Sequence, residues 1–192
     1  MCVSPPIAMG VVLASSSPRR KRLLGKIARK FETKAPKIRE TLLQGESFPS
    51  ASIRLALEKA AAIARKEKNA VVIGADTIAY LGRKIYRKTD SKAAARRILL
   101  ELSGRTHYVI TGVCVLFPDG KCAKYAVKAA VRMRRLDGKL LDWYLGTGEW
   151  RARAGCYDIS GKGARLVQSV RGEKETVAGL PLKRLRKVLG KG

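Results

Sequence analysis

The sequence predicts an α/β fold in which a mixed, twisted sheet is flanked by helices. Two observations support this prediction. In the first half of the chain, short apolar runs alternate with stretches whose apolar residues recur at helical spacing. In the second half, a strictly alternating run follows a turn, as expected of an antiparallel hairpin. No linker, repeat or low-complexity segment interrupts the 192 residues, so we expect one domain over 1–192.

The first half of the chain supplies the alternation of strands and helices. Residues 10–14 form an apolar run that predicts a buried strand, and residues 19–27 have leucine and isoleucine on one helical face. A serine followed by Pro18 predicts the start of that helix. The remaining expectations are irregular backbone over 34–48, a helix over 50–68, an apolar strand over 70–75 ending at Asp76 and Thr77, a turn at Gly82 leading into 84–86, and a helix over 90–102 closed by Gly104.

The second half of the chain predicts a long β-hairpin. Residues 108–117 are apolar and β-branched, and the turn Pro118-Asp119-Gly120 follows. From 124 to 134 the pattern alternates as on a half-buried strand. One face carries Tyr125, Val127, Ala129, Val131 and Met133, and the other carries Lys124, Lys128, Arg132 and Arg134. The chain then predicts a short helix over 139–145, a strand over 164–170 and a terminal helix over 182–189.

The composition indicates a folded protein of the cytoplasm. Hydrophobic residues make up 46% of the chain, and no apolar run approaches the ~18 residues of a membrane helix. No positively charged segment precedes residues 11–14, which argues against a secretory signal. The four cysteines lack paired metal-ligand spacing and fit a reduced compartment better than a disulfide framework; they are Cys2, Cys114, Cys122 and Cys156. We therefore expect no membrane association.

The charge of the chain is unusual. There are 41 Lys and Arg against 15 Asp and Glu, which gives a formal net charge of +26. A surface this positive attracts polyanions such as nucleotides, nucleic acid or acidic lipid. The basic residues are dispersed along the chain rather than gathered in one tail, which favours an ordinary solvated surface. It also makes each of the few acids worth individual attention.

A serine-rich loop between the first predicted strand and helix is the first candidate site. A helix N-terminus offers unpaired N–H groups and a partial positive charge, both of which suit phosphate. Neighbouring arginines add bidentate phosphate binding. A capped helix with two surface arginines would give the same pattern, so both interpretations stay open. The residues are Ser15, Ser16, Ser17, Arg19 and Arg20.

Two acids and a lysine are further candidates. Asp76 ends an apolar strand, where ligands gather in open α/β sheets, and its carboxylate could hold Mg²⁺ or act as a base. A turn-forming aspartate explains that position equally well. Glu40 stands among basic residues in an irregular segment, and Lys59 follows Glu58 on the long predicted helix. Without other support, these two read as a surface glutamate and a solvated helix face.

Two other features carry less weight. His107 is the only histidine, which excludes a histidine triad and a multi-histidine metal site, and we expect it to be structural. Residues 161–163 (Gly-Lys-Gly) are not a Walker loop, which needs a longer spacing and a Lys-Ser/Thr ending.

These pieces occur in the order typical of the Maf family, which the chain resembles over nearly its whole length. Residues 13–20 (Leu-Ala-Ser-Ser-Ser-Pro-Arg-Arg) resemble the opening motif, 55–60 (Leu-Ala-Leu-Glu-Lys-Ala) the helix motif, and 74–77 (Gly-Ala-Asp-Thr) the central acid motif. The later matches are Leu102-Ser103-Gly104, His107, Thr111-Gly112-Val113, Gly148-Glu149, Ala154-Gly155, Tyr157 and Gly179-Leu180-Pro181-Leu182.

The resemblance implies a nucleoside triphosphate pyrophosphatase, with a fold of the Maf and inosine triphosphatase type in which two lobes surround a cleft. It makes Asp76 the catalytic proton acceptor and Glu40 a second acid of the site, and the two would hold Mg²⁺ or Mn²⁺. Hydrolysis would yield a monophosphate and pyrophosphate. A homodimer is left open. The implied substrate contacts are Ser15, Ser17, Arg19, Arg20, Lys59, Thr77, Lys88 and Ser160.

The resemblance also bears on the nucleotide base. Arg19 and Thr77 are similar to the branch that acts on dTTP and UTP, whereas Ser160 stands where that branch has glutamine. Serine is shorter and lacks an amide pair, so we expect dTTP, UTP or modified pyrimidine nucleotides as substrates. Other departures from the family pattern remove acids or add bases. Arg22 stands where glutamate is usual, and Ala152 stands where aspartate is usual. On either side of Lys88, Arg87 stands where glycine or another residue is usual, and Thr89 stands where proline is usual.

A basic Maf-like scaffold that binds nucleic acid or other polyanions without catalysis is the alternative. A net positive charge is the first indication of nucleic-acid binding. From the charge alone, we expect weak, nonspecific, salt-sensitive binding to nucleic acid. No recognised nucleic-acid motif is present, and aromatic residues total only 6%. Retention of both Asp76 and Glu40 favours the enzyme.

Overall fold

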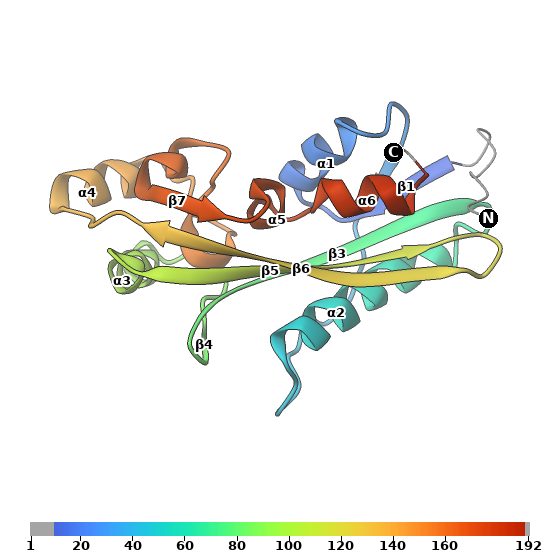
Figure 1. Cartoon of the computed structure of the whole chain (residues 1–192), viewed down its shortest axis with the longest axis horizontal. Helices are drawn as coiled ribbons and strands as arrows, with labels where there is room; N and C mark the ends of the chain where they lie inside the picture. The colour runs from blue at the N-terminus through green and yellow to red at the C-terminus, as the bar shows by residue number, and fades with distance from the viewer. Residues whose placement is uncertain (1–9, 191–192) are drawn as a thin grey trace. The chain divides into compact units, whose positions relative to one another are not determined.

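A computed structural model describes residues 10–190, and within them it shows the predicted mixed α/β fold (Figure 1). Its strands are β1 (Gly10–Ala14), β2 (Glu32–Lys34), β3 (Ala70–Leu81), β4 (Lys84–Ile85), β5 (Thr106–Leu116), β6 (Cys122–Met133) and β7 (Val167–Arg171). Its α-helices are α1 (Pro18–Gly25), α2 (Phe48–Ala64), α3 (Lys92–Leu102), α4 (Gly138–Gly146), α5 (Lys174–Ala178) and α6 (Leu182–Val188). Two 3₁₀ helices are η1 (Ala154–Cys156) and η2 (Lys162–Leu166).

The described strands form one seven-stranded sheet. Its order is β2-β1-β3-β5-β6-β7, with β4 paired to β3. Strand β1 is parallel to both β2 and β3, whereas β4 runs antiparallel to β3 and β7 antiparallel to β6. The sheet is therefore mixed, as the early strand–helix alternation and the later hairpin together predict.

The chain divides into two compact units. Among the described residues, the first contains 10–76, 111–127 and 179–190, and the second contains 77–110 and 128–178. Strands β3, β5 and β6 contribute residues to both units. Each unit has its own apolar cluster: one around β1, β3 and α2 in the first, and one around α3, α4, β5 and β6 in the second.

In the first unit, α1 begins as the sequence predicts. Ser17 is its N-cap, the Ser17 side chain accepts from the N–H of Arg20, and Pro18 occupies the first turn. Leu23 and Leu24 are buried on the inner side of the helix. Figure 1 shows α1 and α6 on the opposite side of the strands from α2. Helix α2 carries Lys59 on its buried face, toward the sheet.

Two glycines allow α2 to lie unusually close to the strands of the first unit. A Cβ on Gly74 of β3 would stand 2.1 Å from the carbonyl oxygen of Ala56 and 2.8 Å from the nitrogen of Ala60. A Cβ on Gly112 of β5 would stand 2.2 Å from the carbonyl carbon of Ser52. Real Cβ contacts are not this short, so both positions require glycine for the observed packing of helix on sheet.

The second unit packs its core on one face of β5 and β6. Along β6, Ala129, Val131 and Met133 are buried, while Lys128 and Arg132 at the alternate positions are exposed, which confirms the predicted alternation. His107 belongs to the same unit and is fully buried, with Nε2 2.9 Å from the hydroxyl of Tyr157. Burial lowers the pKa of His107 to about 4, so it is neutral at physiological pH.

Several boundaries differ from the sequence expectations. Strand β3 does not end at Asp76 but runs on to Leu81, because its second half has a further partner in β4. Helix α2 ends at Ala64 rather than 68. Part of the strand expected over 164–170 is the 3₁₀ helix η2, and the short elements β2 and α5 were not predicted.

The sequence predicts neither a membrane helix nor a disulfide framework. Among the described residues, no helix combines the length and the apolar character needed to cross a bilayer. Cys114, Cys122 and Cys156 are free thiols, in agreement with the absence of a disulfide framework in this part of the chain. Cys2 lies outside the described residues.

We predict that Gly74→Ala destabilises the protein by about 3 kcal/mol or more, the upper end of the range for overpacking. The added methyl group meets helix backbone, which cannot move aside as a flexible side chain can. Gly138→Ala is the matched control, because a Cβ there meets nothing within 4 Å. Urea unfolding of both variants measures the difference. Equal stabilities would show that α2 does not need glycine at position 74.

Candidate functional site

The serine loop after β1 is tied to the N-terminus of α1. The N–H of Ser17 donates to Oγ of Ser15 at 3.1 Å, and Nη1 of Arg20 donates to the same oxygen at 3.4 Å. Nε of Arg20 donates to the carbonyl of Gly179 at 2.9 Å. Ser15 is buried, whereas Arg19 is half-buried. The loop thus combines a helix N-terminus with an arginine held in place from two sides.

A buried ammonium group joins the two candidate acids. Nζ of Lys59 lies 2.5 Å from Oδ1 of Asp76 and 2.7 Å from Oε1 of Glu40. The Lys59 and Asp76 side chains are 5% and 9% exposed, but that of Glu40 is 44% exposed. Asp76 Oδ2 makes no hydrogen bond within residues 10–190. One carboxylate is therefore fixed inside the protein, and the other faces solvent.

Arg20 adds a second positive charge to this cluster. Burial lowers the pKa of the Arg20 guanidinium, and the nearby carboxylates of Asp76 and Glu40 offset only part of that decrease. Arginine stays protonated under all ordinary conditions. Lys59 and Arg20 therefore balance Asp76 and Glu40, and the cluster has no excess of positive charge to neutralise a triphosphate by itself.

The irregular segment that carries Glu40 is fastened to α2 by Arg54. Its guanidinium contacts Glu46 at 2.7 Å, Glu58 at 2.8 Å and the carbonyl of Thr41 at 2.9 Å. These contacts raise the pKa of Arg54, and they lower that of Glu46. Because Thr41 follows Glu40 directly, the contact to its carbonyl limits where Glu40 can lie relative to Lys59.

The three candidates in the second unit are placed on β3 and on two loops. Thr77 follows Asp76 on β3 and is half-buried, and its side chain points to the opposite face of the strand. Lys88 is exposed in the segment after β4. Ser160 is also exposed, and its N–H donates to Oδ1 of Asp158 at 2.9 Å.

The loop that carries Ser160 is held by its own contacts. The buried carboxylate of Asp158 pairs with Arg153 at 3.1 Å. Glu149 accepts from the N–H groups of Lys162 and Gly163 at 3.0 and 2.7 Å. A Cβ on Gly161 would stand 2.1 Å from the Glu149 carboxylate. Ser160 therefore stands on a well-supported turn with its side chain toward solvent.

The donor set fits a divalent cation only in part. Glu40 and Asp76 supply carboxylate oxygens, the ligands that Mg²⁺ prefers, and such ions are commonly held by one or two carboxylates together with substrate phosphates. The described residues contain no group of three or more His, Cys, Asp or Glu side chains placed to hold a metal. Any ion at this site would therefore complete its coordination with water or with oxygens from a substrate.

The structure brings together six of the predicted site residues in the first unit: Ser15, Ser17, Arg20, Glu40, Lys59 and Asp76. The interpretation of Lys59 as a solvated helix residue is wrong, because it lies on the buried face of α2. Sequence reasoning assigned no role to Arg54 or to the carbonyl of Gly179. Gly179 belongs to the motif at 179–182, and that motif is the sequence signal that could have indicated its role. The sequence gives no such signal for Arg54 beyond its i,i+4 spacing to Glu58.

Comparison with known proteins shows the family of the chain. Residues 10–192 match the family model described as "Maf-like protein". The chain belongs to the Maf family. Its curated relatives include a "Nucleoside triphosphate pyrophosphatase" of Anaplasma marginale (strain Florida), 39% identical over 90% of this chain and 89% of the relative. Another is a "dTTP/UTP pyrophosphatase" of Aquifex aeolicus (strain VF5), 38% identical over 94% of each chain.

A solved structure is also similar to this Maf-family chain. A HAM1 protein from Coxiella burnetii aligns with 96% of this chain and 100% of its own length, with a TM-score of 0.48 and 16% sequence identity.

We predict that Lys59→Met destabilises the protein by about 3–5 kcal/mol, because it leaves the Asp76 carboxylate buried without its partner. The double variant Lys59→Met/Asp76→Asn should recover part of that loss, since it removes the uncompensated charge. Lys66→Met, at an exposed position just after α2, is the control and should change stability little. Urea unfolding at neutral pH measures all three. A loss below about 1 kcal/mol in Lys59→Met would contradict a buried ion pair.

Proposed function

We propose that this chain hydrolyses a nucleoside triphosphate to the monophosphate and pyrophosphate at the cluster of Asp76, Glu40, Lys59 and Arg20. The observation that carries the proposal is the pair of carboxylates joined by one buried ammonium group beside a helix N-terminus. Family membership and the names of the relatives support the same reaction class.

Asp76 acts as the proton acceptor in this proposal. Oδ1 is held by Lys59, and Oδ2 is left to accept a proton from a water molecule. The water oxygen forms a bond to the α-phosphorus while the bond from that phosphorus to the bridging oxygen of the β-phosphate breaks. Pyrophosphate leaves with the bonding electron pair, and the water proton passes to Asp76. Lys59 fixes the orientation of the carboxylate throughout.

The serine loop and α1 bind the phosphates. The first turn of α1 presents N–H groups that lack partners within the helix. Arg20 provides a guanidinium whose position is fixed by Ser15 and by Gly179. Arg19 and Lys88 supply further positive charge in this proposal, which the balanced cluster around Asp76 does not offer.

Mg²⁺ or Mn²⁺ is the proposed cofactor, held by Glu40 and Asp76. Bound there, the ion would offset phosphate charge and lower the pKa of a coordinated water. The equal numbers of acidic and basic side chains in the cluster support the need for such an ion.

The free thiols of the described residues fit a cytoplasmic enzyme.

The proposed substrates are dTTP, UTP or modified pyrimidine nucleotides. Arg19 and Thr77 support this assignment through the motifs of the resemblance, and a relative is named for dTTP and UTP. Ser160 replaces the glutamine of that branch with one short hydroxyl group. A water can fill the space that the missing amide leaves, so base selection should be broader.

We predict that the purified protein, supplied with Mg²⁺ or Mn²⁺, converts dTTP and UTP to the monophosphate and pyrophosphate, and that chelation of the metal abolishes turnover. Asp76→Asn should lower turnover by at least about a hundredfold, the lower end for loss of a general base. Ion-exchange separation of the nucleotides measures the products.

One control variant and two contradicting outcomes sharpen this test. Lys66→Met should keep full activity, because position 66 is exposed and outside the cluster. Formation of a diphosphate and free phosphate would contradict the assigned bond. Near-normal turnover in Asp76→Asn would contradict the role of its carboxylate.

A separate prediction concerns selectivity. Ser160→Gln should sharpen the preference for uracil and thymine bases over other nucleotides by about 1–3 kcal/mol, since it restores a polar contact to the base. Ser160→Ala is the matched control and should leave selectivity nearly unchanged. Ratios of kcat/KM across the nucleotides measure the effect. Equal ratios in Ser160→Gln and the unmodified protein would show that position 160 does not contact the base.

A further inference from the structure

One face of the sheet in the second unit is exposed and basic. The core of this unit packs against the face of β6 that carries Ala129, Val131 and Met133. Lys128 and Arg132 point from the other face. Strand β7 extends this face, because its register places Ser169 opposite Arg132 and Arg171 opposite Ala130. Alternation along two paired strands therefore places three cations on one exposed surface.

This basic sheet face is hollowed into a groove. A cavity of about 550 Å³ lies on it. Its lining contains no carboxylate and consists of Thr106, Tyr108, Lys128, Ala130, Arg132, Ser169, Arg171 and Gly172. Within residues 10–190, neither Lys128, Arg132 nor Arg171 makes an ion pair. Their positive charge is therefore available to an anionic ligand.

An aromatic side chain stands at the same groove. Tyr108 is 37% exposed, and its ring stacks on that of Tyr80 with the centroids 5.6 Å apart and the planes at 28°. Nζ of Lys128 lies 5.2 Å from the Tyr108 centroid. A supported ring with an exposed cation beside it offers both a stacking surface and a phosphate contact.

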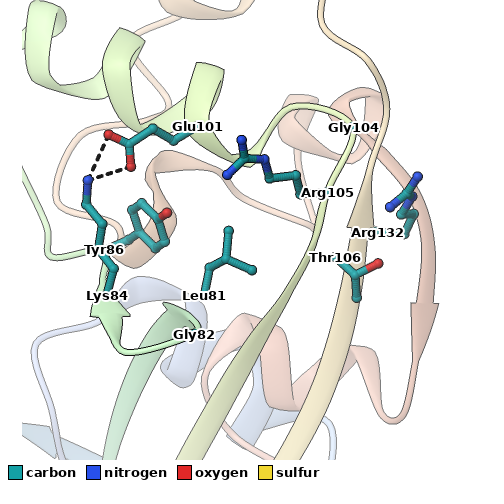
Figure 2. Close-up of a pocket in the computed structure, with 9 residues that line it drawn as sticks. All are labelled: Leu81, Gly82, Lys84, Tyr86, Glu101, Gly104, Arg105, Thr106 and Arg132. Atoms are coloured by element: carbon teal, nitrogen blue, oxygen red, sulfur yellow. Dashed lines mark hydrogen bonds and ion pairs between the residues drawn. The ribbon is translucent and has the colours of Figure 1, made fainter.

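A second cavity of about 720 Å³ continues the groove and shares Thr106 and Arg132 with the first. Figure 2 shows its only carboxylate, Glu101, joined to Lys84, with Arg105 and Arg132 outside that pair. The Lys84–Glu101 distance is 2.7 Å. The positive character of the groove thus extends beyond the first cavity.

We propose that the basic sheet face binds single-stranded nucleic acid. Lys128, Arg132 and Arg171 would contact successive phosphates, and an unpaired base would stack on Tyr108. Positively charged grooves with aromatic platforms are the general means of binding single strands without sequence preference. A duplex keeps its bases stacked on one another and cannot use the tyrosine. This binding is independent of the proposed hydrolysis.

The test uses the full-length protein and a fluorescent oligodeoxythymidine about twelve nucleotides long, within the usual site size for such grooves. The triple variant Lys128→Ala/Arg132→Ala/Arg171→Ala should weaken binding by about tenfold or more at low salt, and should reduce the slope of log affinity against log salt by about two. Tyr108→Leu should weaken binding by about fivefold. Fluorescence anisotropy measures the affinities, and thermal unfolding confirms that the variants are folded.

The matched control is Arg65→Ala/Lys66→Ala/Arg186→Ala, which removes the same charges from exposed positions in the first unit. It should weaken binding far less. Equal losses in the two triple variants would show that diffuse charge binds the strand and would overturn the proposal. Equally tight binding of a duplex of the same length, displacement by dTTP, or no effect of Tyr108→Leu would also overturn it.

Discussion

The ion pair between Lys59 and Asp76 is the interaction on which the site depends. A lysine with its ammonium group buried is tolerated only beside a partner of opposite charge, so the helix that carries Lys59 must reach the strand that carries Asp76. That approach needs glycine at positions 74 and 112, where a methyl group would strike the helix backbone. The glycine and acid positions of the central motif therefore serve one purpose, which is to place a fixed carboxylate beside a solvent-facing one.

The positive charge of the protein is divided between two kinds of environment. In the cluster around Asp76, cations and carboxylates balance each other, and the geometry is fixed by short contacts. On the basic sheet face, the lysine and arginines make no ion pair with any residue of 10–190, and they face solvent. The first arrangement suits catalysis on a bound anion, because its charges are preorganised. The second suits loose binding of a flexible polyanion, because affinity there comes from counterion release rather than from fixed geometry.

Local signals made some features predictable from the sequence, and tertiary contacts hid others. The start of α1 at Ser17 and Pro18 and the alternation along β6 follow from local physics, and the structure has both. The continuation of β3 beyond Asp76 depends on a partner strand, which a local apolar run does not report. Residue patterns alone left Lys59 as a surface lysine, because only the approach of α2 to the sheet buries it. Arg54 was missed for the same reason: its contacts join a loop and a helix that no short motif links.

The central claim is that the carboxylate held by Lys59 directs a water molecule to the α-phosphorus of a nucleoside triphosphate. Hydrolysis of dTTP in water labelled with heavy oxygen, followed by phosphorus NMR of the separated products, tests this claim most directly. The account predicts that the label enters only the monophosphate, because the new bond forms at the α-phosphorus. Label in the pyrophosphate or in free phosphate would place the attack at another phosphorus and contradict the account.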